Sequence, residues 1–233
     1  MKLSIIVPAF NESATIKSLL ERVLAVDLPK EVIVVDDGST DTTASLVERF
    51  ADRGVKLLRH AHNRGKGAAI RTGLDAMTGD VVIIQDADLE YDPNDYPAVI
   101  GPIVRGEASV VYGNRWHRGT GVSYRRYLWV GRLLTLVANL LYNARINDEP
   151  TCYKAFRTDV LKRIRLCADG FDFCPEVTAK VRRLGYRIHE VPIAYRPRSF
   201  EQGKKICWTD GLTALWVLVK LRLLPRQQLI HKP

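Results

Sequence analysis

The sequence has little of what marks small secreted, membrane-spanning or repetitive proteins. Its 233 residues include four cysteines, whose spacing fits neither a metal site nor a disulfide framework. The most apolar segments, 123–142 and 211–224, are too short or too interrupted by basic residues for a comfortable membrane span. No repeat, low-complexity stretch or linker divides the chain, and no export signal is visible. We therefore expect one domain of a cytoplasmic protein.

Two common nucleotide-binding motifs are also missing. No Gly-x-Gly-x-x-Gly follows the first apolar run, which argues against a dinucleotide oxidoreductase. Residues 63–68 look like a phosphate-binding loop, but the Walker pattern needs a glycine where His60 stands and Ser or Thr where Gly67 stands. Lys66 in this segment could lie near a diphosphate or could be a solvated lysine at the start of a helix.

Acidic residues are absent from two stretches of a chain whose net charge is +9. Residues 108–147 and all residues after Asp210 contain no acid but several arginines and lysines. Such patches attract phosphates on nucleotides, nucleic acids or anionic lipids. The apolar segments 123–142 and 211–224 lie here, and each is typical either of a helix at a membrane interface or of a core helix. For 123–142 the arginines around Trp129 favour the interface.

Short aliphatic or β-branched runs alternate with helical stretches through the first half of the chain. The predicted strands are residues 3–7, 32–35, 55–58, 81–84 and 109–112. Residues 13–25 and 41–50 have the patterns of helices, the second with several possible caps. This alternation predicts an α/β, Rossmann-like fold with a mostly parallel central sheet flanked by helices, followed by amphipathic C-terminal helices.

Three acids follow the predicted strand 81–84, at the sheet edge where α/β enzymes bind their ligands. Asp86, Asp88 and Glu90 alternate, so an extended segment would point them to one side. Such clustered charge is costly without a cation, and hard oxygen ligands suit Mg²⁺ or Mn²⁺. A solvated acidic loop is the alternative.

Other acids follow the first two predicted strands. Glu12 begins the first crossover, and Asp37 follows the second strand. Carboxylates at these positions can accept hydrogen bonds from a base or a ribose. Residues 36–41 also fit a simple turn before a capped helix, which is the structural alternative.

Taken in order, these motifs resemble those of the inverting family 2 glycosyltransferases, which have the GT-A fold. The segments that carry the likeness are Val7-Pro8-Ala9-Phe10-Asn11-Glu12, Val35-Asp36-Asp37-Gly38-Ser39, Asn63-Arg64-Gly65-Lys66-Gly67 and Asp86-Ala87-Asp88. Gly113-Asn114-Arg115 and the basic segment after it are similar to dolichyl-phosphate mannose synthases and other polyprenyl-phosphate sugar transferases.

The resemblance implies roles for particular residues. It implies that the metal is held by Asp88 with help from Asp86 and Glu90, although mannose synthases often carry Gln where Glu90 stands. It implies that a basic loop, with Arg198 first and Lys205 second, closes over the donor phosphates, while a solvated loop is the alternative. The residues expected to hold the nucleotide-sugar are Pro8, Phe10, Glu12, Val35, Asp37, Asp86, Ala87, Asp88, Arg115, Arg198 and Lys205.

The implied reaction moves a hexose from GDP-mannose or UDP-glucose to a polyprenyl or dolichyl phosphate, with inversion. A phosphate acceptor is already ionised and needs no strong base, and Arg115, Arg125 and Arg126 would bind it at the membrane surface. A hydroxyl acceptor would need a carboxylate base, for which Glu176 or the weaker Asp172 is the candidate. Glu176 could instead be a favourable charge at a helix N-terminus.

The same likeness sets expectations for organisation and partners. Residues 1–113 would bind the donor, 114–205 the acceptor, and 206–233 would form an amphipathic tail, all within a single glycosyltransferase domain. We expect a cytoplasmic enzyme that associates peripherally with the membrane. A membrane-embedded protein could be its partner. Carboxylates clustered at strand ends argue against nucleic acid as a partner. A sugar-phosphate nucleotidyltransferase and a polyanion- or lipid-binding module are the rival functions.

Overall fold

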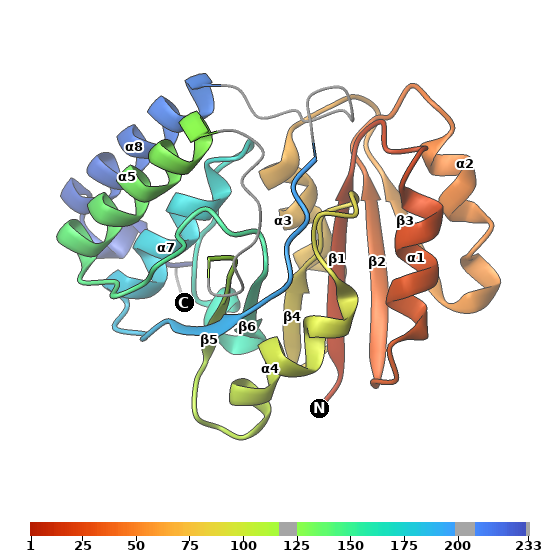
Figure 1. Cartoon of the computed structure of the whole chain (residues 1–233), viewed down its shortest axis with the longest axis horizontal. Coiled ribbons are helices and arrows are strands. Elements are labelled where there is room, and N and C mark those ends of the chain that lie inside the picture. The colour runs from red at the N-terminus through yellow and green to blue at the C-terminus, as the bar shows by residue number, and fades with distance from the viewer. Residues whose placement is uncertain (117–124, 199–207, 232–233) are drawn as a thin grey trace.

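A computed structural model describes residues 1–116, 125–198 and 208–231, without the side chains of 125–127 and 208. Within these residues, seven strands form one sheet in the order β3-β2-β1-β4-β6-β5-β7 (Figure 1). The strands are β1 Leu3–Ala9, β2 Lys30–Asp36, β3 Val55–Arg59, β4 Val81–Ile84, β5 Val110–Asn114, β6 Lys154–Arg157 and β7 His189–Pro192. All neighbouring pairs are parallel except those of β6, which runs antiparallel to β4 and to β5.

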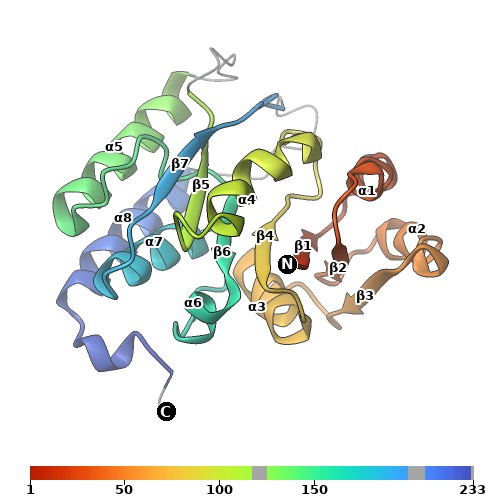
Figure 2. The same ribbon diagram turned by 90° about the horizontal axis from the view of Figure 1, so that it is seen from below.

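Helices cover both faces of this sheet. Their bounds are α1 Ile16–Ala25, α2 Thr43–Glu48, α3 Lys66–Ala76, α4 Tyr96–Val104, α5 Arg125–Tyr142, α6 Thr158–Lys162, α7 Phe173–Arg183 and α8 Trp208–Leu223. Helices α1 and α4 pack on one face, and α3, α6 and α7 pack on the other (Figure 2). Helices α5 and α8 form a further layer on α7. The predicted α/β fold with a mostly parallel sheet is confirmed.

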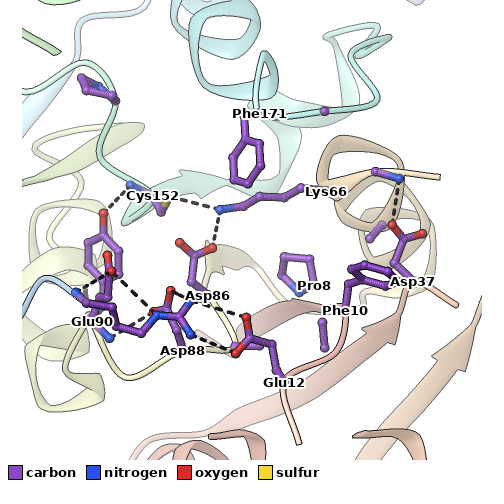
Figure 3. A pocket seen from close by; sticks show the side chains of 18 of the residues that line it. Pro8, Phe10, Glu12, Asp37, Lys66, Asp86, Asp88, Glu90, Cys152 and Phe171 are labelled. Atoms are coloured by element: carbon purple, nitrogen blue, oxygen red, sulfur yellow. Dashed lines mark hydrogen bonds and ion pairs between the residues drawn. The ribbon is translucent and has the colours of Figure 1, made fainter. Parts of the chain in front are cut away.

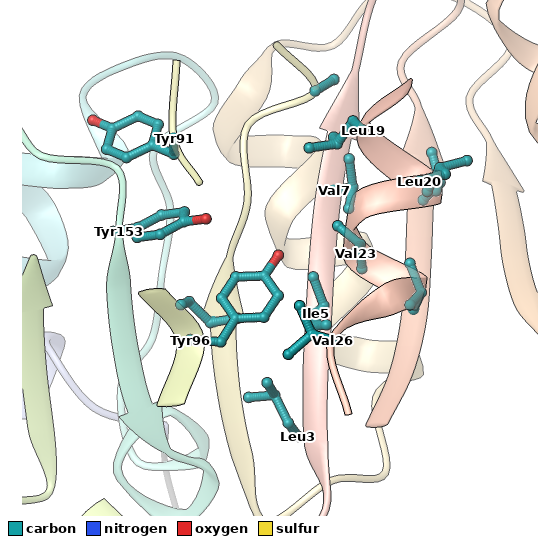
Figure 4. Close-up of a cluster of buried hydrophobic side chains, with 14 of the residues drawn as sticks. Leu3, Ile5, Val7, Leu19, Leu20, Val23, Val26, Tyr91, Tyr96 and Tyr153 are labelled. Carbon is teal, nitrogen blue, oxygen red and sulfur yellow. The ribbon is translucent and has the colours of Figure 1, made fainter. Parts of the chain in front are cut away.

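The core under α1 explains why the first strands form where the sequence predicts them. Alternate residues of β1 and one face of α1 are buried against each other, as apolar positions three or four residues apart require (Figure 4). Three tyrosines continue this cluster towards β6. Tyr96 and Tyr153 each donate a hydroxyl hydrogen bond to Gln85 Oε1, at 2.7 and 2.5 Å. These bonds fix the residue that follows β4, immediately before the predicted acidic site.

The pairing register of the strands brings the carboxyl ends of β1, β2 and β4 to the same edge of the sheet. Ala9 lies opposite Asp36, so β1 and β2 end side by side. Because β6 runs antiparallel to β4, with Ala155 opposite Ile83, its first residues lie at the edge where β4 ends. Residues far apart in the sequence therefore meet at the carboxyl ends of β1, β2 and β4.

The two C-terminal apolar helices, α5 and α8, pack in the core on one face only, and their place at a membrane interface stays a prediction. Each buries one face against α7 and leaves large apolar side chains in solvent. Exposed fractions reach 63% for Trp129, 73% for Leu140, 63% for Trp216 and 80% for Leu223. Among the described residues, no helix has the length and apolar character needed to cross a bilayer.

Candidate active site

A pocket of about 390 Å³ opens where β1, β2 and β4 end (Figure 3). We call it the central pocket. It is lined by Pro8, Ala9, Phe10, Glu12, Asp37, Asn63, Gly65, Lys66, Ala69, Asp86, Ala87, Asp88, Glu90, Tyr91, Arg115, Pro150, Cys152, Gly170, Phe171, Tyr195 and Arg198. Most of the residues predicted to bind the donor thus lie around one cavity.

The Asp37 carboxylate organises the loop that leads into α3. It accepts hydrogen bonds from the backbone N–H of Arg64 at 2.9 Å and of Gly65 at 2.8 Å, and it contacts His60 Nδ1 at 2.6 Å. Gly65 has a φ of +94°, and an added Cβ would collide with the Asp169 carbonyl, so glycine is required here. Asp37 therefore shapes the wall that starts at α3.

Lys66 and Asp86 form an ion pair across the floor of the pocket. Burial opposes the charge on Lys66, but the carboxylate of Asp86 outweighs burial and holds the lysine pKa well above its usual value. Lys66 Nζ also lies 3.1 Å from Cys152 Sγ and over the Phe171 ring. The lysine is thus a fixed positive charge at the carboxyl end of β4.

Arg198 inserts its guanidinium among three carboxylates. Its Nη1 lies 3.1 Å from Glu12 Oε2 and its Nη2 lies 2.8 Å from Asp88 Oδ2. Its Nε is 3.8 Å from Glu90 Oε1, which also accepts the backbone N–H of Arg198 at 2.8 Å. Burial, together with the nearby charges of Asp86 and Glu90, raises the pKa of Asp88 to about 7.

Arg115 lines the central pocket beside Tyr195, and a buried carboxylate fixes its guanidinium. Its Nε and Nη2 bind both oxygens of the buried Asp148 carboxylate, at 2.8 and 2.7 Å. The guanidinium lies over the Tyr195 ring, 4.9 Å from its centre. Tyr195 in turn donates to Glu90 Oε2 at 2.6 Å, which links this wall to the Arg198 cluster.

Known proteins resemble this chain over most of its length. Residues 4–165, well over half of the sequence, match the family described as Glycosyl transferase family 2. The chain belongs to this family. One member, the dodecaprenyl-phosphate galacturonate synthase of Rhizobium johnstonii, is 30% identical over 212 residues, which cover 88% of this chain and 62% of that protein. Another, the dolichol-phosphate mannosyltransferase of Pyrococcus furiosus, is 28% identical over 88% of this chain and 59% of that protein.

This family 2 chain therefore spans about six tenths of the length of these two relatives. Among solved structures, glucosyl-3-phosphoglycerate synthase from Mycobacterium tuberculosis in complex with uridine diphosphate has a TM-score of 0.74 at 23% identity. The alignment covers 96% of this chain and 81% of that one. At this identity the likeness establishes the GT-A fold.

The acidic segment of this family 2 member differs from the extended geometry expected from the sequence. Residues 86–90 bend after β4. Asp86 turns towards Lys66, whereas Asp88 and Glu90 face Arg198. All three acids line the central pocket, as expected, but the extended segment assumed for them is wrong, because the chain bends and the acids pair with different cations. No group of three His, Cys, Asp or Glu side chains in the described residues is arranged to hold a metal ion.

The carboxylates around Arg198 nevertheless suit a divalent cation. Glu12, Asp88 and Glu90 already surround one positive group, and their oxygens are hard ligands of the kind that Mg²⁺ and Mn²⁺ prefer. A metal at Asp88 would take over the charge balance that Arg198 supplies here.

Glu176 lies away from the central pocket. Its side chain is only 3% exposed and accepts the backbone N–H groups of Cys167 and Ala168, both at 2.8 Å. Lys180, one turn later in α7, lies 2.6 Å from it. This placement corrects the expectation that Glu176 acts at the sugar, since its carboxylate ties a loop to the first turn of α7. Asp172 caps the same loop through Gly170 and does not line the pocket.

Val35 does not line the central pocket. Its side chain is fully buried and packs with Ile33 and Ala69 between β2 and α3, so its role in nucleotide binding stays a prediction. The side chains of Arg125 and Arg126, and all of Lys205, lie outside the described residues.

Sequence reasoning gave no role to several pocket residues, among them Tyr91, Cys152, Phe171 and Tyr195. Tyr91 directly follows the acidic motif, and its hydroxyl accepts the backbone N–H of Cys152 at 3.0 Å. Only the fold brings that pair together.

Proposed function

We propose that this family 2 glycosyltransferase moves a hexose from a nucleotide-sugar to a polyprenyl phosphate at a membrane surface. Its similarity to relatives named for polyprenyl- or dolichol-phosphate substrates supports the acceptor class. GDP-mannose and UDP-glucose are the proposed donors.

The central pocket supports donor binding through its charges. Pro8, Phe10 and Asp37 lie on the side of β1 and β2, where the nucleoside would rest. Lys66 and Arg115 are fixed cations on the remaining walls, suited to the diphosphate. A divalent cation held by Asp88, with help from Asp86 and Glu90, would, when bound, neutralise charge on the departing diphosphate.

The observation that carries the choice of acceptor is the pairing of the lining acids. Each described carboxylate that lines the central pocket has a cation or amide partner: Asp37 binds backbone N–H groups, Asp86 binds Lys66, and Glu12, Asp88 and Glu90 surround Arg198. Such paired groups are poorly suited to take a proton from a hydroxyl acceptor. Asp88, whose pKa is raised to about 7, is the exception, but it is the acid proposed to hold the metal. A phosphate acceptor is already ionised and needs positioning and charge neutralisation, which Arg115 offers.

Exposed apolar side chains support membrane association. Trp129 and Leu140 on α5, and Trp216 and Leu223 on α8, lie on the outer layer of the molecule, and Arg132, Lys220 and Arg222 belong to the same helices. Aromatic and basic side chains together suit the headgroup region of a bilayer. We propose that the protein binds the cytoplasmic membrane surface peripherally, alone or beside a membrane-embedded partner.

The test is transfer of labelled sugar, with Mn²⁺ or Mg²⁺, from a panel of nucleotide-sugars into detergent-dispersed polyprenyl phosphate. Label in the lipid phase is expected, and Asp88→Ala should abolish it while leaving the protein folded. Undiminished transfer by that variant would contradict the role given to Asp88.

A soluble acceptor is the second candidate, because the M. tuberculosis enzyme of similar fold has been crystallised with Mn²⁺, UDP-glucose and glycerol 3-phosphate. Donor turnover without lipid labelling, together with transfer to a small phosphorylated alcohol, would select it. The absence of turnover with every donor would leave the polyanion- or lipid-binding function.

A further inference from the structure

A second cavity, of about 330 Å³, lies where α5 ends. We call it the arginine pocket. It is lined by Asn143, Ala144, Arg145, Arg182, Arg187 and Ile188, and it shares no lining residue with the central pocket. Among the residues that the structure describes, three guanidinium groups and no carboxylate line it, and such like charges repel one another unless an anion is bound.

The three arginines do different things. Arg182 closes the end of α5, since its Nη2 donates to the Asn143 carbonyl and its Nη1 to the Tyr186 carbonyl, both at 2.7 Å. Arg145 and Arg187 are exposed at the mouth of the cavity. Burial, with the adjacent charges of Arg145 and Arg187, lowers the pKa of Arg182, as expected when like charges are brought together. Arg182 is therefore structural. Arg145 donates through its Nε to Asn143 Oδ1 at 3.2 Å, and the exposed guanidinium groups of Arg145 and Arg187 are the ones that a ligand can reach.

The backbone gives independent support. Asn143 and Arg145 have φ values of +50° and +55°, in the left-handed region. Asparagine is common in this conformation, but arginine is not, and neither residue is a glycine. Asn139 holds the turn by bonding both the N–H and the C=O of Ile146. The turn thus accepts local strain and places the Arg145 guanidinium beside Arg182 and Arg187.

The nearest acid along the chain does not cancel this charge inside the cavity. Glu190 follows Ile188 by two residues, but its carboxylate accepts the N–H groups of Asn147 and Asp148 at 2.9 and 3.0 Å. It also binds the Asn147 side chain at 2.7 Å. The Glu190 carboxylate is thus hydrogen-bonded to residues 147 and 148, and Glu190 does not line the cavity.

The position of the cavity suggests where its ligand comes from. Helices α5, α7 and α8 lie side by side (Figures 1 and 2). The last turn of α7 contacts the ends of both outer helices, since Arg182 binds the end of α5 and Arg183 binds the carbonyls of Leu221 and Leu224. Leu140, the last of the exposed large apolar residues of α5, precedes the cavity residue Asn143 by three positions.

We infer that Arg145 and Arg187, beside the fixed positive charge of Arg182, form a binding site for a phosphate-bearing anion, such as the headgroup of an acidic phospholipid or a free phosphate. The site extends the proposed function because a headgroup bound here would orient the outer helix layer on the membrane. The phosphate chemistry itself does not depend on sugar transfer.

The test compares wild-type protein with the double variant Arg145→Gln, Arg187→Gln, which keeps Arg182 and hence the end of α5. The control is Arg22→Gln, Arg49→Gln, which removes the same charge from exposed positions on or next to α1 and α2. Binding is measured by co-sedimentation with phosphatidylcholine vesicles that contain or lack phosphatidylglycerol, and by calorimetric titration with inorganic phosphate.

We expect the Arg145/Arg187 variant to bind the phosphatidylglycerol vesicles about 30-fold more weakly, with the control close to wild type. That result identifies a lipid headgroup site. Equal vesicle binding, with phosphate binding lost only in the Arg145/Arg187 variant, supports the site with a free phosphate as its ligand. If the Arg145/Arg187 variant matches the control in both measurements, the inference is overturned.

Sugar transfer to detergent-dispersed polyprenyl phosphate separates this inference from the proposed function. Both double variants should retain it, because neither changes the central pocket. If wild-type protein shows no transfer but its binding to acidic vesicles depends on Arg145 and Arg187, the proposed function fails and the arginine pocket stands.

Discussion

Replacing Arg198 with glutamine should make the donor-free protein bind Mn²⁺ more tightly. In the structure, its guanidinium lies where a cation would balance Glu12, Asp88 and Glu90. A metal that binds Asp88 must first displace this group. Arg198→Gln removes the competing charge but keeps a side chain of similar length.

The size of the effect follows from the contacts. Arg198 makes charged hydrogen bonds with Glu12 at 3.1 Å and Asp88 at 2.8 Å. One such bond is worth about 1.5–3 kcal/mol. If Arg198→Gln removes even about 1.5 kcal/mol of this competing interaction, Mn²⁺ should bind about tenfold more tightly.

The pH dependence gives a second measure. A metal needs the ionised carboxylate, and the pKa of Asp88 is raised to about 7 by burial and the neighbouring acids. Mn²⁺ binding should therefore strengthen as the pH rises through 7. Because Arg198 lowers that pKa, the midpoint in Arg198→Gln should lie at higher pH.

The assay is a titration of free Mn²⁺ by electron paramagnetic resonance, without donor. Arg196→Gln is the matched control, since Arg196 is exposed and lies two residues away. If Arg198→Gln binds Mn²⁺ no better than Arg196→Gln, Arg198 does not occupy the cation position.

Two further predictions concern charges that the fold buries. Lys66→Met should lower the unfolding free energy by about 3 kcal/mol because it leaves Asp86 without its partner, and adding Asp86→Leu should recover most of the loss. Urea unfolding of both single variants and the double variant measures this coupling, and simple additivity would contradict it. Glu176→Gln should lower the melting temperature by breaking the pair with Lys180, while folded protein keeps its rate of sugar transfer. If the Glu176→Gln protein is folded but shows little turnover, Glu176 takes part in the reaction and the structural role alone is wrong.

Local patterns predicted the parts of the fold that depend on neighbours in sequence. The apolar run 81–84 is β4 with the same bounds, and the predicted helix 123–142 corresponds to α5. Strands β6 and β7 were missed because four-residue runs with charged residues show no clear alternation. Their places in the sheet depend on partners far away in the chain.

The same distinction applies to the site. The acids after β4 could be located from the sequence because strand ends converge in parallel sheets. Their directions could not, since the bend at Asp88 and the insertion of Arg198 depend on contacts across the fold. The Glu176 pairing was readable in principle, because Lys180 follows it at the four-residue spacing of helical ion pairs.

The antiparallel strand β6 has a consequence for folding during synthesis. Strands β3, β2, β1 and β4 are contiguous in the sheet and complete by Ile84, so they can assemble while the rest of the chain is still being made. β4 then has an unpaired edge until Lys154–Arg157 arrives, because among the described strands β6 alone joins β5 and β7 to β4. We expect chains truncated between these points to aggregate through the β4 edge.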